Sequence, residues 1–428
     1  MPHQYPSPAR AWYLVILLTV AYVFSFVDKY LPALLLEPIK ADLGVSDTEM
    51  GLLLGPAFAL LYATLGLPLG WLADRVRRNS LVAAGVALWS LATASSGLAG
   101  NFTQLLVARV GVGIGDAALA PGALSLISDS FPPDKRGRPV ALYITAQSFG
   151  AGLAMLGGGA VLAWAATQSV LDLPLAGVVT PWQFTFLAVG LPGVLVALLL
   201  LVAREPARET SWRGGVSMKH TLAWLSVRWR AFGSLTALVC VMTIVAYSQN
   251  WYAALFQRNW GWDIGRYATW SGLALILVGP LVVNITGWWC DQLLSRGRAD
   301  GPLSVVIAGT LLLLPPGVLI PLMPTGELAM AVWVLNLCGL SMVSAAAPVA
   351  LLAITPGEMR GQISALFYMV IMLMGLVLGP LAVGVFNDQF FAGERLDLAC
   401  ALVPVVVGLP GLALLRSARR HYAAAAAG

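Results

Sequence analysis

The sequence has 428 residues, of which 59% are hydrophobic and only 11% are charged. So apolar a composition excludes an ordinary soluble domain and indicates a membrane protein. The formal net charge of +5 does not indicate a nucleic-acid partner, because the basic residues are distributed as orientation in a membrane requires.

Twelve apolar stretches follow one another along the chain, each close to the length of about 20 residues that a helix needs to cross the hydrocarbon. Long apolar runs without alternation of polar residues argue against a β-barrel. The first run is too long and too charged for a secretory signal, so we expect a retained helix. We predict an all-α membrane protein with transmembrane helices over residues 11–34, 50–72, 80–98, 103–129, 138–165, 182–203, 231–257, 268–290, 303–322, 328–355, 362–387 and 398–415.

The distribution of basic residues predicts the orientation of the chain. Two of the 25 lysines and arginines lie inside predicted spans, and nineteen fall in the connections on the side of the N-terminus. The opposite side keeps only Lys40, Arg258, Arg266 and Arg395. This bias predicts a multi-pass inner-membrane protein with both termini in the cytoplasm.

Away from their ends, the predicted spans contain four charged residues. Asp28 and Lys29 lie side by side in the first, within VFSFVDKYLPALLL, and Arg109 and Asp116 lie two helical turns apart in the fourth. An unpaired charge at that depth costs several kcal/mol, so these groups need partners or water. Helix rise places all four at depths where they can border one cavity.

Two interpretations of this quartet remain open. In the first, it is a neutral cluster that only fixes helix packing. In the second, a carboxylate exchanges its basic partner for a proton or for substrate, because burial favours the neutral carboxylate and a nearby guanidinium favours the charged one. We predict proton coupling at Asp28 and Asp116, and an anionic headgroup at Lys29 and Arg109.

The chain contains an internal repeat. GWLADRVRR, which begins at Gly70, matches GWWCDQLLSRGR at an offset of about 217, and DKRGRPVAL matches EMRGQISAL at an offset of about 224. The longest polar interruption, 204–220, separates six stretches from six. We therefore predict an N-terminal bundle over 1–203, a cytoplasmic linker over 204–230 and a C-terminal bundle over 231–428, with the substrate site between the bundles.

Several segments resemble those of a known family. GWLADRVRR resembles the loop signature of the major facilitator superfamily, and ARVGVGIGDAALAP resembles its fourth-helix motif. Within that superfamily FSFVDKY, GIGDA, PWQFTFLAVGLPGVLVALLLLVAREP and MRGQISALFYMVIMLMGLVLGP resemble the Spinster-like branch, which usually has Asp-Arg and Gly-Glu where this chain has Asp28-Lys29 and Gly115-Asp116. The resemblance implies two pseudo-symmetric six-helix bundles, alternating access and, from animal members, substrates such as lysophospholipids or sphingosine phosphate.

The resemblance also implies a cytoplasmic gate. In the family the aspartate that matches Asp74 lies against the start of the eleventh helix, whose partial positive charge attracts a carboxylate. Arg75 and Arg78 would then pair with cytoplasmic acids such as Asp129 and Asp134. The predicted gating residues are Gly70, Asp74, Arg75, Arg78, Asp291, Arg360 and Gly361.

The second half is polar but uncharged where the first half carries its ions. An offset of about 221 aligns SFVDKYLPAL with AYSQNWYAAL, so amides replace the ion pair. We expect the second half to hold the apolar body of an amphipathic substrate, although ordinary interhelical hydrogen bonds are the alternative. The further substrate-binding candidates are Tyr143, Gln147, Gln249, Asn250, Trp251 and Tyr252.

Other chemistries lack candidate residues. The sequence has no GxxxxGK[ST] loop for an ATP-driven pump, no histidine in the spans and no ligand-like cysteine spacing, so we expect no enzyme, cofactor or metal site. The closing HYAAAAAG is interpreted as a tail outside the fold. We predict a monomeric, proton-coupled carrier of an amphipathic, lipid-like organic anion. The alternatives are a proton symporter for a small organic or sugar acid, a drug/proton antiporter, a non-transporting receptor and a lipid-modifying enzyme.

Overall fold

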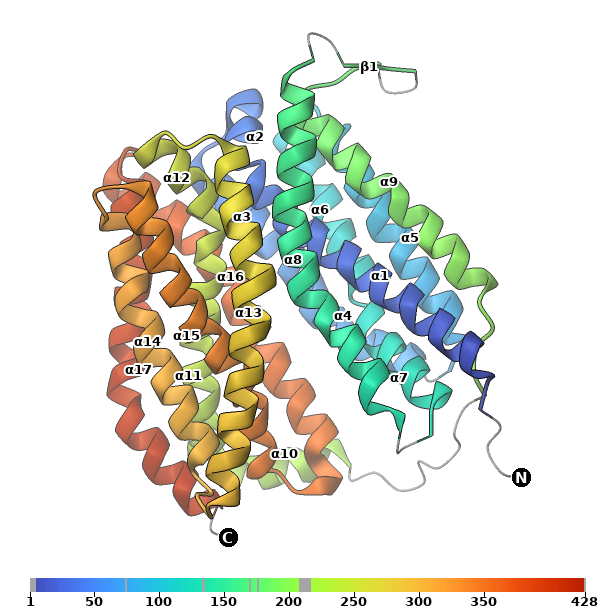
Figure 1. The fold of residues 1–428 in the computed structure, drawn as a ribbon, viewed down its shortest axis with the longest axis vertical. Helices are drawn as coiled ribbons and strands as arrows, with labels where there is room; N and C mark the ends of the chain where they lie inside the picture. Colours follow the sequence, from blue (N-terminus) through green and yellow to red (C-terminus); the bar gives the residue numbers. More distant parts are fainter. Residues whose placement is uncertain are drawn as a thin grey trace. The chain divides into compact units, whose positions relative to one another are not determined.

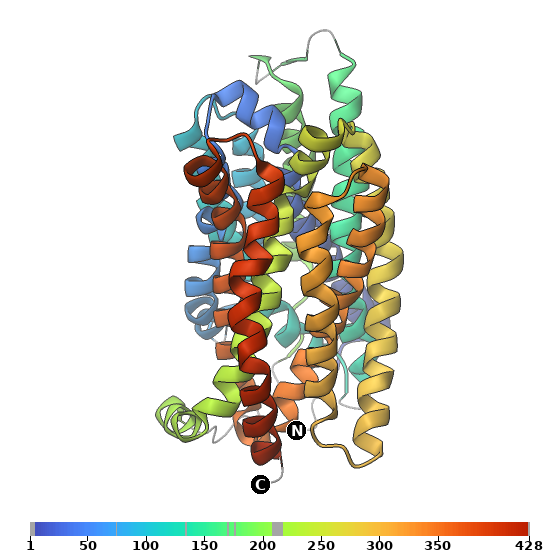
Figure 2. The ribbon, with the colours of Figure 1, turned by 90° about the vertical axis from the view of Figure 1, so that its left-hand side faces the viewer.

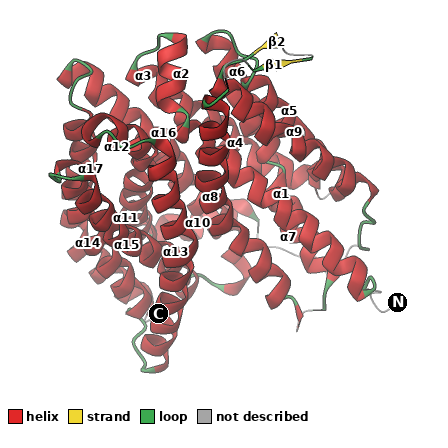
Figure 3. Ribbon diagram, turned by 45° about the horizontal axis from the view of Figure 1, so that its top comes forward, coloured by secondary structure: helices red, strands yellow, loops and turns green. Residues whose placement is uncertain are grey.

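The computed structural model describes residues 5–73, 75–132, 135–168, 171–174, 177–207 and 217–426. Nearly all of these residues are helical (Figure 3), and one short antiparallel pair joins strands β1 (Asp172–Leu173) and β2 (Gly177–Val178). The chain forms two compact units, Met1–Ser211 with Asp263–Ile276, and Trp212–Trp262 with Leu277–Gly428. We call them the first and the second unit.

The first unit contains nine helices of its own among the described residues (Figure 1). They are α1 (Pro8–Leu34), α2 (Leu36–Leu43), α3 (Asp47–Leu54), α4 (Pro56–Ala73), α5 (Arg78–Ser96), α6 (Phe102–Asp116), α7 (Leu119–Ser130), α8 (Gly137–Ala166) and α9 (Pro181–Val202). A further helix, α13 (Ile264–Ser295), contributes its first part to this unit and the rest to the second.

The second unit is built around α11. Besides the later part of α13, its elements, in chain order, are α10 (Met218–Val227), α11 (Trp229–Ser248), η2 (Gln249–Trp251), α12 (Tyr252–Trp260), α14 (Gly301–Leu319), η3 (Ile320–Leu322), α15 (Gly326–Ala353), η4 (Gly357–Met359), α16 (Arg360–Phe391) and α17 (Leu396–Ala426). In Figure 2 the short yellow-green helix α10 is seen end on, so it runs across the long axes of α11 and α17.

Eleven helical stretches of the described chain are long and apolar enough to cross a membrane. They match the predicted spans except that over 80–98, where α5 is a 19-residue helix whose serines and threonines lower its apolar character. The prediction of an all-α membrane protein is confirmed. The fourth predicted span is interrupted after Asp116, where α6 ends, and α7 begins three residues later, at Leu119.

Glycines let the helices of the first unit approach closely, as small residues do in apolar bundles. A Cβ atom on Gly115 would lie only 2.6 Å from the Gly85 carbonyl oxygen and from the Trp89 amide nitrogen of α5. A Cβ atom on Gly113 would collide with the Phe58 carbonyl of α4. These contacts hold α6 tightly between α4 and α5, and so they fix the height of its two charged residues.

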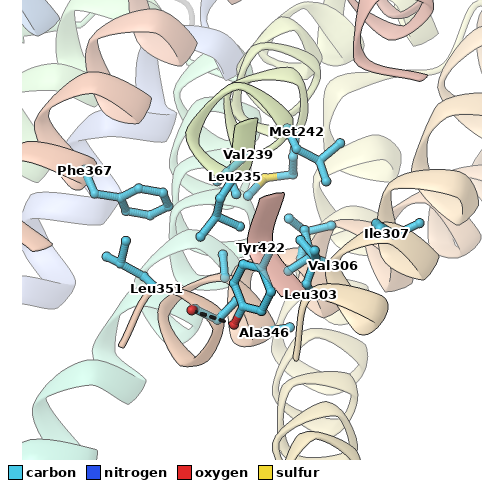
Figure 4. Packing of buried hydrophobic residues seen from close by; sticks show 14 of the residues in the cluster. Leu235, Val239, Met242, Leu303, Val306, Ile307, Ala346, Leu351, Phe367 and Tyr422 are labelled. Atoms are coloured by element: carbon cyan, nitrogen blue, oxygen red, sulfur yellow. Dashed lines mark hydrogen bonds between the residues drawn. The ribbon is translucent and has the colours of Figure 1, made fainter. Parts of the chain in front are cut away.

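The core of the second unit extends to the end of the chain. Tyr422 is fully buried among residues of α11, α14 and α15, and its hydroxyl donates a hydrogen bond to the Ala350 carbonyl at 2.8 Å (Figure 4). The expectation that HYAAAAAG lies outside the fold is wrong for its described residues, 421–426, because the alanines among them continue α17 as good helix formers and the helix carries the Tyr422 ring into the core.

Candidate functional site

Two buried ion pairs join α1 to α6. The Arg109 Nη1 atom lies 3.1 Å from each carboxylate oxygen of Asp28, and its Nη2 donates to the Asp28 backbone carbonyl at 3.4 Å. The Lys29 Nζ atom lies 2.7 Å from Asp116 Oδ2. The structure therefore brings all four predicted residues together, as two neutral pairs.

Hydroxyl groups complete the coordination of both carboxylates. Thr93 of α5 donates to Asp28 Oδ1 at 2.6 Å, and Ser25 of α1 donates to Asp116 Oδ1 at 2.5 Å. Ser25 also accepts a hydrogen bond from Lys29 at 3.1 Å, one helical turn away. Each carboxylate thus has one basic and one hydroxyl partner, which is the coordination that offsets burial of a charge.

The two pairs differ in accessibility. The side chains of Asp28, Arg109 and Asp116 are only 3–4% exposed, whereas that of Lys29 is 17% exposed. Beside Asp28 a small cavity between α1, α5 and α9 is lined in part by Ser90, whose buried hydroxyl has no hydrogen-bond partner among the described residues. A buried hydroxyl of this kind is a natural site for an ordered water.

Aromatic rings surround the Lys29 ammonium. Its Nζ atom lies 4.6 Å from the ring centroid of Phe26, 5.0 Å from that of Tyr62 and 5.5 Å from that of Phe58. The faces of such rings attract a cation electrostatically. We call these three rings, from α1 and α4, the Lys29 cage.

Tyr143 of α8 faces the same region, and Gln147 does not share its environment. The Tyr143 ring is 2% exposed and stacks on Tyr22 with centroids 4.5 Å apart. Its hydroxyl has no hydrogen-bond partner among the described residues, and Tyr22 also packs edge-on against Phe26 of the Lys29 cage. Gln147, one turn further along α8, is exposed. The roles of both as substrate residues stay predictions.

The predicted candidates of the second unit have partners within that unit. The Gln249 amide donates to Asn336 Oδ1 at 2.7 Å and accepts from the Trp333 indole at 2.9 Å. Trp251 is buried and donates to the Pro380 carbonyl at 2.9 Å. Asn250 is half-buried and Tyr252 is buried. Their substrate-binding role is likewise still a prediction.

The uncharged residues that contact the buried ion pairs of the first unit, or the Gln249 amide of the second, were not identified from the sequence. Asn336 was detectable as an amide within an apolar stretch, and it also donates to the Leu313 carbonyl at 2.8 Å. Ser25 lies four residues before Lys29, a helical spacing that signals a contact. Thr93 and the cage rings of Phe58 and Tyr62 carried no such signal, because their partners are distant in the sequence.

Arg78 anchors a third buried network, at the start of α5. Its guanidinium donates to Ser125 Oγ at 2.8 Å, to Glu205 Oε1 at 2.9 Å, to the Pro206 carbonyl and to Asp129. The predicted pairing with Asp129 is therefore present. The network ties α5 to α7 and to the segment after α9.

The other predicted gating residues are more exposed or lie outside the described chain. The Arg75 guanidinium stacks over the Trp71 ring at 3.5 Å, and a Cβ atom on Gly70 would lie 3.8 Å from Pro121. In the second unit Asp291 and Gly361 are exposed. Asp74 and the predicted partner Asp134 lie outside the described residues. The gating role of the whole set stays a prediction.

One contact of Arg360 repeats between the units. Its Nε donates to the Thr355 carbonyl at 3.4 Å, and Arg136 Nε donates to the Phe131 carbonyl at 2.9 Å. Each arginine thus reaches the carbonyl five residues before it, at the start of the long helix that follows. The same geometry in each unit supports the internal repeat.

Comparison with known proteins gives consistent matches. A family model described as Major Facilitator Superfamily matches residues 18–380. The chain is 29% identical over 410 residues to an MFS-type efflux pump of Mycolicibacterium smegmatis, covering 95% of this chain and 92% of that protein. It is 34% identical over 204 residues to human protein spinster homolog 1, covering 47% of this chain and about a third, 36%, of that protein.

Solved structures agree with these matches. A bacterial homologue of the human lysosomal transporter Spinster, in an inward-facing and unoccupied conformation, superposes with a TM-score of 0.82 at 25% identity, covering 98% of both chains. A D-xylose–proton symporter gives a TM-score of 0.65 at 16% identity, covering 92% of this chain and 96% of the symporter. The second likeness shows the fold alone.

Proposed function

The chain belongs to the Major Facilitator Superfamily of membrane transporters, within which it is similar to the Spinster proteins, and we propose that it moves an amphipathic organic anion coupled to protons. It is a multi-pass transporter and not an enzyme. In this proposal the bundles over 1–203 and 231–428, joined by the linker over 204–230, rock about a site near the bilayer midplane.

The observation that carries the proposal is the crossed pairing of the four buried charges. Both cations are occupied by carboxylates, so an anionic headgroup has no free partner while Asp28 and Asp116 are charged. Protonation of one carboxylate releases its cation for the headgroup. Proton and anion therefore favour each other's binding, and this linkage is reciprocal.

The surroundings of the charges support an amphipathic substrate. Aromatic rings flank Lys29, and the corresponding position in the second unit carries the uncharged Gln249 and Asn250. A substrate whose headgroup is held by the first unit would have its apolar body against uncharged surface. Lysophospholipid-like anions fit this description.

A second candidate is proton-coupled drug efflux. The likeness to the efflux pump of Mycolicibacterium smegmatis extends over 95% of this chain. An exported cationic drug would be exchanged for protons, so protons and the drug would compete for the same carboxylates. The sign of the pH effect separates the two candidates.

The proposal places a monomeric carrier in the inner membrane, with both termini in the cytoplasm. The excess of lysine and arginine in the connections on the side of the N-terminus supports this orientation.

Flux into sealed proteoliposomes tests the function. We expect a labelled lysophosphatidate to cross faster when the pH gradient favours proton movement in the same direction, and a decyltrimethylammonium probe not to do so. The Asp28→Asn/Asp116→Asn double variant serves as the control. Equal flux of the lysophosphatidate with and without the gradient would reject proton coupling, and no flux of any amphiphilic anion would reject the substrate class.

A further inference from the structure

The two ion pairs are not equivalent in the number of contacts that each cation makes. Arg109 contacts both carboxylate oxygens and the backbone carbonyl of Asp28, and its side chain is 3% exposed. Lys29 contacts one carboxylate oxygen and one hydroxyl, and it is 17% exposed. Separating Arg109 from Asp28 leaves a planar guanidinium buried without its bidentate partner, which is the more costly change.

The surroundings of Lys29 can hold its ammonium without Asp116. Phe26, Phe58 and Tyr62 lie within 5.5 Å of its Nζ atom, so cation–π attraction persists when the carboxylate becomes neutral. Phe58 and Tyr62 stack on each other at 5.1 Å, which fixes the two rings. The cage therefore keeps a positive charge in place for a new anionic partner.

A second donor faces the same place. The buried Tyr143 hydroxyl has no hydrogen-bond partner among the described residues, although such a group normally has one. Stacking on Tyr22 fixes its ring, and the Tyr22 ring in turn packs against Phe26 of the cage, with centroids 5.0 Å apart. A headgroup oxygen that replaces the Asp116 carboxylate at Lys29 would supply the missing acceptor.

We infer that Lys29, its aromatic cage and the Tyr143 hydroxyl form the subsite for an anionic headgroup, whereas Arg109 remains bound to Asp28. The inference rests on the proposed function, and it assigns the exchange of carboxylate for headgroup to the Lys29–Asp116 pair. Among the described residues Asp116 contacts Lys29 and Ser25, both of α1. Among these Lys29 is the charged neighbour, so its release is the direct consequence of protonating Asp116.

Binding to the purified full-length protein in an uncharged detergent tests the subsite. The probes are decyl sulfate and decyltrimethylammonium, which share a chain length and have permanent opposite charges, and calorimetry gives their affinities. We expect Phe58→Leu and Tyr62→Leu each to weaken decyl sulfate binding about threefold to tenfold. Tyr143→Phe should weaken it about threefold, and Lys29→Arg should retain binding that Lys29→Gln loses.

Matched controls separate recognition from folding. Tyr62→Phe keeps the ring, and Phe186→Leu makes the same ring-to-aliphatic change at a buried position of α9, where the neighbouring ring is that of Trp182. Tyr62→Phe should bind decyl sulfate more tightly than Tyr62→Leu does, and Phe186→Leu should bind it like the unmodified chain. In transport assays the cage variants should raise KM while kcat stays within about twofold, which a purely structural role does not predict.

Two results would overturn the inference: cage variants that bind decyl sulfate as tightly as Phe186→Leu does, or decyltrimethylammonium binding more tightly than decyl sulfate. If the protein shows proton-coupled flux but the cage variants bind decyl sulfate with unchanged affinity, the subsite is rejected and the proposed function is retained. Specific binding that the cage variants weaken, without proton-coupled flux, would support the subsite and reject the proposed function.

Discussion

Asp28 and Lys29 are adjacent in the chain and opposite in charge, yet each pairs with a different residue of α6. Successive residues of a helix point about 100° apart, so neighbours in α1 reach different parts of the facing helix. The result is two neutral pairs, one with Arg109 and one with Asp116. This crossed pairing links the position of α1 against α6 to the protonation of either carboxylate.

Neutralising Asp116 should remove the response of transport to pH. We expect Asp116→Asn to abolish pH-dependent flux, because an amide cannot exchange a proton, and Asp28→Asn, which leaves the Lys29–Asp116 pair intact, to keep it. Folded protein should stay in the membrane in both variants. Flux measured over a series of pH values in proteoliposomes checks this. If both variants keep the pH profile of the unmodified chain, neither carboxylate couples protons to transport.

Removing the buried Arg78 guanidinium should destabilise the first unit. Arg78→Ala removes the buried guanidinium that pairs with both Asp129 and Glu205, a loss of about 3 kcal/mol. Thermal unfolding in detergent should show a lower midpoint. The exposed neighbour Arg77 provides the control Arg77→Ala, which should unfold like the unmodified chain, and equal midpoints for the two variants would contradict a stabilising role.

Gly115 should not tolerate a methyl group. Its Cβ atom would lie 2.6 Å from two backbone atoms of α5, which cannot move without shifting the helix. Gly115→Ala should therefore cost about 1–3 kcal/mol and displace Asp116 from Lys29. Gly157→Ala on α8, where nothing lies within 4 Å, should be harmless, and a Gly115→Ala protein as stable and active as this control would refute the packing argument.

The last turns of α17 should contribute to stability. Tyr422→Ala removes a fully buried ring, which typically costs about 3–5 kcal/mol, and Tyr422→Phe removes only the hydrogen bond to Ala350, at about 1 kcal/mol. Arg420→Ala, at an exposed position of the same helix, is the control. Unfolding temperatures in the order Ala below Phe below the control are expected, and three equal values would show that the segment is dispensable.

Hydropathy and burial of charge predict much of this molecule, since they act locally along the sequence. A long apolar run has to form a helix in the membrane, and charges such as Asp28 and Arg109 have to find each other there. Which cation pairs with which carboxylate depends on how the helices are rotated, and that is set by distant contacts such as Gly115 against α5.

The aromatic cage and the end of α17 show where local patterns are insufficient. Phe58 and Tyr62 are ordinary residues of an apolar span, and only the fold places them around Lys29. Tyr422 follows Arg419, Arg420 and His421 and precedes a run of alanines, so its segment resembles a tail until its tertiary partner is known.

Proton uptake on ligand binding is the most direct measurement of the central claim. In weakly buffered solution with a pH indicator, adding decyl sulfate to the unmodified protein should take up protons, because the anion binds the form in which a carboxylate is neutral. Its affinity should accordingly rise as the pH falls. The Asp28→Asn/Asp116→Asn variant should show no uptake, and specific binding by the unmodified protein with no uptake, or with proton release, would contradict the account.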